Sequence, residues 1–467
     1  MKKTKIFFIN GALLTFTSLI MKSIGMIFNI YISNKIGSEA IGTFSLVMSV
    51  YMYFVILATS GLSLACTCIV SEQFAEGNFF SGIKAVKNCF LFALFLGVGS
   101  SIIILTFANT ISQNWLKSVI SSIPLYIISI SLPFISISSV INGYFTAVRK
   151  AYKSAISQVF ELVIKIIATI ILLKFNIHNE IEYICICLIL ANVLSEILSC
   201  LLSILLYKKD IVKYNKKIKR ITCINSFKKK ILEITFPICI TSYIRSSLST
   251  LKQFIIPNRL MLCGITYNMA LSEYGKINGM TLSILMFPTV FIMSFSNLLI
   301  PEFTSLAAKK YNKRILDVCT KAFWVTSLFS ICLFLFFFFF ANNISLIIFK
   351  NLECAKYIKL LSPIIFFIYS DNILDNMLKG LNKQFNVMVC NILDLILTIG
   401  FLYFLLPVLG LTGYLLAIII SEIFNFCISY FQLYKTTGFK IKLPIIFCYF
   451  LFAILSFYNI IKDFIIC

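Results

Sequence analysis

The stretch AVRKAYKSAISQVFELVIK, residues 147–165, aligns without a gap with GLNKQFNVMVCNILDLILT, residues 380–398. In this alignment Glu161 falls on Asp394, and further matched positions are Gln158 with Asn391 and Lys165 with Thr398. Each copy begins with a basic or polar turn and continues into an apolar run that still carries a carboxylate. The match predicts that the chain contains two copies of one helical unit.

A second match extends the repeat. ANVLSEI at 191–197 aligns with AIIISEI at 417–423 and places Glu196 on Glu422. The two matches are offset by similar distances along the chain, so the register is nearly preserved between them. Internal repeats of this length are common in transporters, where the substrate site lies between the halves.

The composition is that of a membrane protein. Of 467 residues 60% are hydrophobic and 13% are charged, and the mean hydropathy is +0.96, whereas soluble domains carry about 25% charged residues. Apolar runs of about 20 residues, enough for a helix to cross a bilayer, recur throughout. We therefore expect an all-α polytopic protein with about thirteen transmembrane helices, near residues 6–32, 44–70, 88–108, 121–147, 155–175, 181–206, 231–256, 276–300, 319–341, 358–378, 388–408, 411–434 and 444–461.

The net charge of +23 is explained by topology and does not indicate nucleic-acid binding. With the N-terminus in the cytoplasm, about 28 basic residues fall in inner segments and about 8 in outer loops, as the positive-inside rule requires. The start MKKTK is followed by an apolar run too long for a signal peptide, which predicts an uncleaved first helix. We expect a multi-pass protein of the cytoplasmic membrane, in contact with its lipids.

Four segments are expected along the chain. They are a six-helix lobe at 1–206, a basic cytoplasmic linker at 207–230, a second six-helix lobe at 231–434, and one or two additional helices within 435–467. Because each lobe has an even number of helices, the lobes share one orientation and form parallel repeats. We expect them to enclose a central cavity in a monomeric protein.

Charged and polar side chains lie on single faces of the predicted helices. Lys22 and Asn29 share one face of the first helix, and Arg245 and Lys252 share one face of the seventh. Charge within a bilayer normally faces a cavity or a partner. Three cations, Lys22, Arg245 and Lys252, are predicted to contact an anionic headgroup, since a guanidinium matches phosphate oxygens.

A further set of polar residues is predicted to line the cavity or to take part in ion coupling: Asn29, Gln158, Glu161, Lys165, Glu196, Asn391, Asp394 and Glu422. The structural alternative is that such residues join helices by hydrogen bonds. Glu161 and Lys165, four residues apart, also suit a self-neutralised pair.

Enzymatic and metal-dependent functions are not indicated. The chain has one His, His178, and its 16 Cys are scattered through apolar helices as small hydrophobic residues. No cluster has metal-ligand spacing. No cofactor, catalytic residue or metal site is expected.

Several strings resemble one transporter family: GYFTAVRKAYKSAISQVFE, SYIRSSLSTLKQFIIPNRL, YGKINGMTLSILMFPTVFIMSFSNLLIPEF and NIYISNKIGSEAIGTFSLVMSVY. They are similar to the stage V sporulation protein B group. This group lies in the polysaccharide-transporter branch of the multidrug/oligosaccharidyl-lipid/polysaccharide (MOP) flippase superfamily and resembles the lipid II flippases. The resemblance covers about residues 5–435. It departs at Cys68, where relatives usually have a base, and at Lys252, where they often have an acid.

The resemblance implies outward movement of a polyprenyl-pyrophosphate saccharide or peptidoglycan precursor by alternating access, in spore-cortex or other envelope biogenesis. Coupling to H⁺, Na⁺ or the membrane potential is compatible with the buried acids. Two alternatives remain open. One is a cation-coupled multidrug exporter of the same superfamily, and the other is a membrane scaffold for envelope synthases that does not transport.

Overall fold

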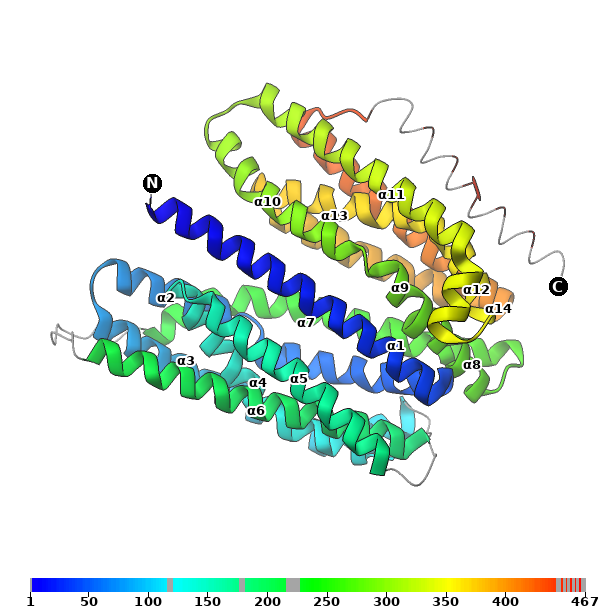
Figure 1. Cartoon of the computed structure of the whole chain (residues 1–467), viewed down its shortest axis with the longest axis horizontal. Coiled ribbons are helices and arrows are strands. Elements are labelled where there is room, and N and C mark those ends of the chain that lie inside the picture. Colours follow the sequence, from blue (N-terminus) through cyan, green and yellow to red (C-terminus); the bar gives the residue numbers. More distant parts are fainter. Residues whose placement is uncertain are drawn as a thin grey trace. The chain divides into compact units, whose positions relative to one another are not determined.

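The structure is a computed structural model that describes residues 2–115, 121–175, 181–215 and 227–441, together with six single positions near the C-terminus. Within these ranges every regular element is a helix (Figure 1). The predicted all-α class is therefore confirmed. Most of the predicted helix at 444–461, the middle of the basic linker (216–226) and His178 lie outside the described residues.

The first half of the chain forms α1 (Lys2–Thr59) to α7 (Phe227–Leu260). Between them lie α2 (Leu62–Ala75), α3 (Phe79–Asn114), α4 (Ile123–Ala147), α5 (Ala151–Phe175) and α6 (Ile181–Asn215). The ends of the predicted linker are thus helical, because α6 and α7 both extend into it. The predicted loop at 33–43 is also helical, apart from a break at Gly37, whose φ of 81° leaves the helical region.

The second half begins with short pieces and continues with long helices. The elements are η1 (Met261–Cys263), α8 (Tyr267–Tyr274), the π-helix η2 (Gly275–Thr281), α9 (Leu282–Met286), α10 (Thr289–Ala308), α11 (Asn312–Phe349), α12 (Glu353–Leu361), η3 (Ser362–Ile364), α13 (Ile365–Gly380) and α14 (Gln384–Thr437). The prediction of an outer loop at 257–276 is therefore wrong in detail, because α7, η1 and α8 occupy most of these residues.

Eight helices in the described part of the chain are long and apolar enough to cross a membrane, and a ninth is counted if the bent pair Tyr267–Met286 and Thr289–Ser296 forms one span. The chain is a multi-pass membrane protein. The predicted count of thirteen is not confirmed. One reason is that α7, which carries Arg245 and Lys252, is not among these apolar spans.

One of the apolar spans, α14, is a helical hairpin. At Gly410 the backbone turns with φ 57° and ψ −129°, and a Cβ on Gly413 would lie 2.5 Å from the carbonyl oxygen of Leu405. Gln432 near one end donates to the sulfur of Cys390 near the other. The segments 384–409 and 411–437 are therefore antiparallel, and each exceeds the ~20 residues that cross a bilayer. This reversal falls where the sequence predicts a two-residue loop, at 409–410.

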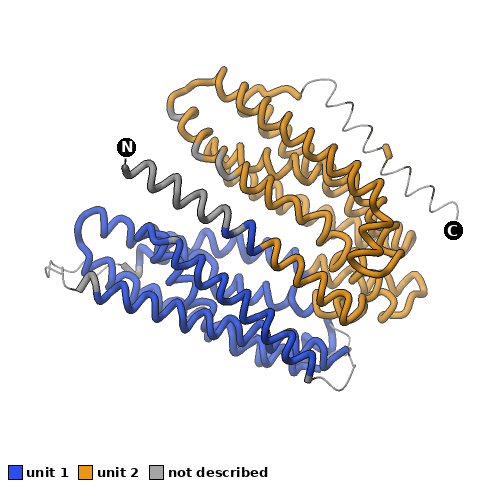
Figure 2. Tube along the Cα trace, viewed as in Figure 1, with its two compact units in different colours: residues 1–21, 46–250 blue, residues 22–45, 251–467 orange. Residues whose placement is uncertain are grey.

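The chain forms two compact units (Figure 2). Unit 1 contains residues 1–21 and 46–250, and unit 2 contains residues 22–45 and 251–467. These units are defined by contacts, whereas the predicted lobes at 1–206 and 231–434 are defined by the repeat along the sequence. The lobe boundaries stay a prediction.

The internal repeat is visible in the turns of the backbone. Gly77 and Lys310, which are 233 positions apart, both have positive φ (79° and 56°), as do Arg149 and Asn382 (59° and 61°) at the same spacing. The backbone hydrogen bonds also correspond, for example Lys150 N to Phe145 O and Lys383 N to Leu378 O. Each unit therefore uses the same turns between equivalent helices, which supports the repeat inferred from the sequence.

The basic turn before α5 is fixed by an acid. Asp210 at the end of α6 is buried and binds Lys150 (3.0 Å) and Lys153 (2.6 Å). The two lysines are part of the basic cluster that the sequence assigns to the cytoplasmic side. They therefore also join the α4–α5 turn to α6 within unit 1.

Unit 2 contains a contact that only small residues allow. A Cβ on Gly275 would lie 2.0 Å from the carbonyl oxygen of Ser38, and one on Gly42 would lie 2.1 Å from that of Leu271. The hydroxyls of Ser38 and Ser272 are 2.7 Å apart. The α1 segment after Gly37 thus packs directly, backbone against backbone, on α8 and η2.

We expect Gly275→Ala to destabilise the protein by about 1–3 kcal/mol. The added methyl group would collide with the backbone carbonyl of Ser38, and a backbone atom cannot rotate away as a side chain can. Gly99→Ala in α3 is the matched control, since a Cβ there meets nothing within 4 Å. Thermal unfolding of both variants in detergent measures the difference. Equal melting temperatures for the two variants would show that this packing is loose.

Candidate functional site

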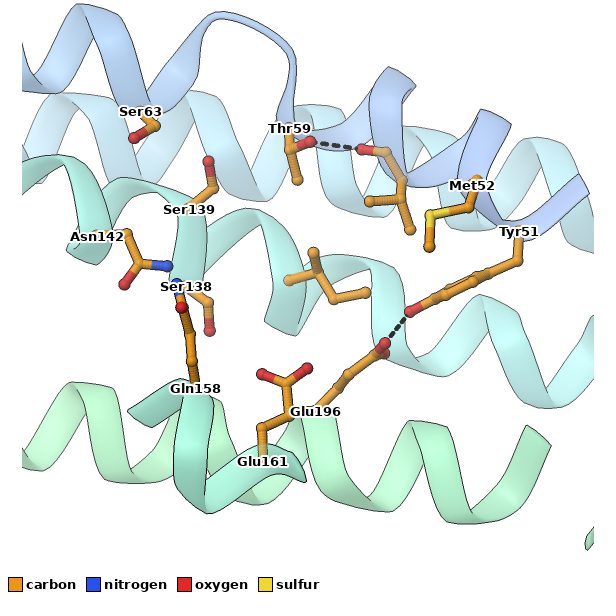
Figure 3. Close-up of a pocket in the computed structure, with 12 residues that line it drawn as sticks. Tyr51, Met52, Thr59, Ser63, Ser138, Ser139, Asn142, Gln158, Glu161 and Glu196 are labelled. Atoms are coloured by element: carbon orange, nitrogen blue, oxygen red, sulfur yellow. Dashed lines mark hydrogen bonds between the residues drawn. The ribbon is translucent and has the colours of Figure 1, made fainter. Parts of the chain in front are cut away.

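Unit 1 has an open cavity of about 470 Å³ among its transmembrane helices (Figure 3). It is lined from α1 and α2 on one side and from α4, α5 and α6 on the other. The lining residues are Tyr51, Met52, Val55, Thr59, Ser63, Ile135, Ser138, Ser139, Asn142, Gln158, Glu161 and Glu196. Three of the residues predicted from the sequence, Gln158, Glu161 and Glu196, are thereby brought to one cavity.

The Glu196 carboxylate is held by two partners. The Tyr51 hydroxyl on α1 donates to its Oε1, and the Asn192 amide one turn earlier on α6 donates to the same oxygen at 2.7 Å. Tyr51 from α1 and Asn192 from α6 therefore fix the carboxylate at the wall of the cavity. Figure 3 shows the bond from Tyr51. Neither Tyr51 nor Asn192 was predicted as a site residue. Tyr51 lies in a segment without polar periodicity, so the sequence held little signal for it.

Glu161 on α5 lies close enough to Glu196 to interact electrostatically, and Lys165, one turn further on, interacts with both carboxylates. The helices α5 and α6 are packed together here, with the Ser199 hydroxyl donating to the backbone oxygen of Ser157 at 3.1 Å. Lys165 therefore neutralises more than its own helix neighbour. It compensates a pair of acids contributed by two helices.

Unit 2 contains the corresponding pair of acids. Glu422 interacts electrostatically with Asp394, and Lys252 on α7 interacts with both. The two carboxylates are the repeat partners of Glu196 and Glu161. The lysine comes from another helix than in unit 1, because the position equivalent to Lys165 is occupied by Thr398. The structure thus places Lys252 beside carboxylates of its own unit.

Two further acids in unit 2 were missed by the sequence analysis. Asp371 and Asp375, one turn apart on α13, interact with each other, and Asp371 also interacts with Asp394 and Glu422. Asn425 donates to Asp371 at 2.8 Å, Ser429 to Asp375 at 3.3 Å, and Asn391 to Asp375 at 3.4 Å. The signal was present, since two acids four residues apart in an apolar helix mark one face.

The equivalents of Asp371 and Asp375, 233 positions earlier, are Ser138 and Asn142, which line the unit 1 cavity.

The remaining predicted residues lie on exposed or partly exposed helix surfaces. The Lys22 ammonium lies 3.7 Å from the sulfur of Met293, and the Asn29 amide lies 3.4 Å from the Ser283 hydroxyl, both within unit 2. Arg245 lies in unit 1 and is exposed. Because Lys22 and Lys252 are in one unit and Arg245 is in the other, a common anion site for the three cations stays a prediction.

Arg245 does not line the cavity of unit 1. The face of α7 that contacts α1 carries Tyr243, which donates to the Leu57 backbone oxygen at 3.0 Å, and Thr250, which donates to that of Ser49 at 3.4 Å. At 100° per residue, Arg245 lies on the opposite face of α7. In the described part of the chain no group of three or more His, Cys, Asp or Glu is arranged to hold a metal ion.

We expect Lys252→Met to destabilise the protein by about 2 kcal/mol, since removal of one partner leaves carboxylates of a partly buried cluster uncompensated. In the double variant Lys252→Met with Asp394→Asn the loss should be smaller than the sum of the single losses. Thermal unfolding in detergent of all four proteins measures this coupling. Additivity to within about 0.5 kcal/mol would mean that Lys252 does not compensate Asp394.

Comparison with known proteins identifies the family. Residues 8–307 match the family described as "Polysaccharide biosynthesis protein". The chain is 24% identical over 426 residues to stage V sporulation protein B of Bacillus subtilis, covering 88% of this chain and 80% of that protein. It is 18% identical to sporulation protein YkvU of B. subtilis over 367 residues, covering 77% and 79% of the two chains.

Solved structures show the same fold. An inward-facing multidrug resistance transporter of the MATE family, within the MOP superfamily, superposes with a TM-score of 0.69 at 15% identity, covering 90% of this chain and 94% of that one. A MOP superfamily transporter from Pyrococcus furiosus, described as having a binding pocket of reverse polarity, gives 0.59 at 14% identity, covering 91% and 95%. With the family match over residues 8–307, this chain belongs to the polysaccharide biosynthesis protein family and has the fold of the MOP superfamily of transporters.

Proposed function

We propose that this protein moves a lipid-linked saccharide, joined to its polyprenyl carrier by a pyrophosphate, across the cytoplasmic membrane. The observation that carries the proposal is the match to the polysaccharide biosynthesis family in a chain with a transporter fold. The relatives named above are a stage V sporulation protein and a second sporulation protein. A peptidoglycan precursor for spore or envelope synthesis is the substrate that we favour.

The physical problem is the headgroup. A pyrophosphate and a sugar lose their hydration in hydrocarbon, which costs many kcal/mol unless protein groups replace the water. The polar cavity of unit 1 offers such groups for part of the headgroup inside a helical bundle. Lys22, Arg245 and Lys252 are the cations that we assign to the pyrophosphate, because charge-assisted hydrogen bonds to phosphate are strong.

The proposed movement is alternating access by a monomer, with the N-terminus in the cytoplasm. Under this topology the Lys150–Lys153 turn faces the cytoplasm, and the cavity of unit 1 begins about one to two helical turns from it, at Asn142 and Gln158. The acid pairs of the two units are candidates for coupling to H⁺ or Na⁺, or for sensing the membrane potential. The family and its structural neighbours are transporters, and we assign no catalytic residue.

A cation-coupled multidrug exporter is the second candidate, favoured by one observation. Unit 2 holds four interacting carboxylates, Asp371, Asp375, Asp394 and Glu422, and Lys252 opposes two of them, Asp394 and Glu422. Such a region suits a cationic ligand better than an anionic one. A scaffold role predicts instead that these charges are dispensable.

We expect reconstituted protein to flip a fluorescent polyprenyl-pyrophosphate saccharide across liposome membranes, and Arg245→Ala to slow flipping about tenfold or more, the effect of losing one charged hydrogen bond. Flipping is measured by quenching of the label in the outer leaflet. Arg314→Ala, at an exposed arginine near the start of α11, is the control and should change the rate less than twofold.

Three outcomes separate the candidates. Absence of flipping by the wild type, with export of a lipophilic cation instead, would favour the multidrug exporter. Absence of both activities would favour the scaffold. Flipping that is unchanged by Arg245→Ala would remove Arg245 from the phosphate site and leave the transport function standing.

A further inference from the structure

We infer that the cavity of unit 1 binds the sugar ring of the headgroup and that the pyrophosphate stays outside it. The inference rests on the proposed function and assigns one part of the substrate to one set of side chains. It starts from the chemistry of the lining. None of the twelve described residues that line the cavity is Lys or Arg, and nine of them carry a hydroxyl, an amide or a carboxylate.

These groups are of the kinds that bind polyols. Sugar hydroxyls both donate and accept hydrogen bonds, and amides, hydroxyls and carboxylates together supply both partners. The cavity volume of about 470 Å³ is within the range of about 300–1,000 Å³ typical of small-molecule sites. Tyr51 and Met52 add an aromatic and an apolar surface on one side.

Several polar groups of the lining are available to a ligand. Gln158 is exposed, and its amide has no hydrogen-bond partner among the described residues. The Asn142 oxygen accepts from Ser154 at 2.7 Å, so its amide nitrogen is directed toward the cavity beside Ser138 and Gln158 (Figure 3). Glu196 is already oriented by Tyr51 and Asn192. The arrangement is therefore preorganised to bind hydroxyl groups.

The same cavity disfavours a pyrophosphate. Glu161 and Glu196 present two carboxylates, and Lys165 lies near both but does not line the cavity. An anion of two or more charges placed among carboxylates is repelled, and the repulsion is larger inside a bundle than in water. Arg245 lies on the opposite face of α7 and does not enter this cavity.

The equivalent positions of unit 2 carry different chemistry. Ser138 and Asn142 of the cavity correspond to Asp371 and Asp375, which are acids. Asp371 and Asp375 also accept hydrogen bonds from Asn425, Ser429 and Asn391. Unit 1 therefore has neutral polar groups that can bind a sugar at the positions where unit 2 has acids.

The test compares two lipids that differ only in the sugar. Binding of polyprenyl-pyrophosphate-N-acetylglucosamine and of sugar-free polyprenyl pyrophosphate is measured by microscale thermophoresis with the full-length protein in nanodiscs. We expect Gln158→Leu to weaken binding of the saccharide lipid about tenfold, the effect of one lost hydrogen bond. Binding of the sugar-free lipid should change less than twofold.

Three controls make the test decisive. Thr106→Val, a polar-to-apolar change on α3 away from the cavity, should leave both affinities unchanged. The double variant Gln158→Leu with Ser139→Ala should lower the saccharide affinity further, and thermal unfolding shows whether each variant is folded. Tetraphenylphosphonium should not compete with the saccharide lipid.

The inference is overturned if Gln158→Leu leaves the saccharide affinity unchanged, if it weakens both lipids equally, or if tetraphenylphosphonium displaces the saccharide lipid. In those cases wild-type binding of the lipids would still support the proposed function. A wild type that binds neither lipid would instead overturn the proposed function together with this assignment.

Discussion

The structure depends on one constraint, which is that a carboxylate placed among transmembrane helices must be compensated within its own bundle. Carboxylates at the membrane centre cost at least ~2.5 kcal/mol each. In unit 1 the pair Glu161 and Glu196 is held by Tyr51, Asn192 and Lys165. These partners come from α1, α5 and α6, so one acid pair joins three helices around the cavity. The same need explains why unit 2 brings a lysine from α7 to its own acid pair.

The two copies of the internal repeat share their backbone turns but differ in the side chains at equivalent positions. Turns at Gly77 and Lys310, and at Arg149 and Asn382, keep their positive φ over a spacing of 233 residues. The acid pair is kept in both units, whereas the lysine moves from α5 to α7 and the neutral residues Ser138 and Asn142 become Asp371 and Asp375. The two copies of one bundle thus differ at these positions, with a hydroxyl and an amide in unit 1 and additional carboxylates in unit 2. Such divergence is what a transporter needs if its halves serve the substrate and the driving force separately.

The sequence predicts the parts of this architecture that depend on local pattern. Hydropathy gives the helical membrane class, and the aligned stretches give the repeat and the acids Glu161, Asp394, Glu196 and Glu422. The sequence does not predict which distant residues contact one another. Tyr51 reaches Glu196 across 145 residues of chain, and no periodicity within its own helix marks it. The tight contact of Gly275 with Ser38 likewise depends on how two distant segments pack, so the break at Gly37 and the helix α8 were expected as loops.

The central claim is that the ligand is an anionic lipid-linked saccharide and not a cation. Native mass spectrometry of the purified protein, released from detergent in the presence of equal concentrations of polyprenyl-pyrophosphate-N-acetylglucosamine and ethidium, tests it most directly. The account predicts a one-to-one adduct with the mass of the saccharide lipid. An adduct with ethidium alone would contradict it.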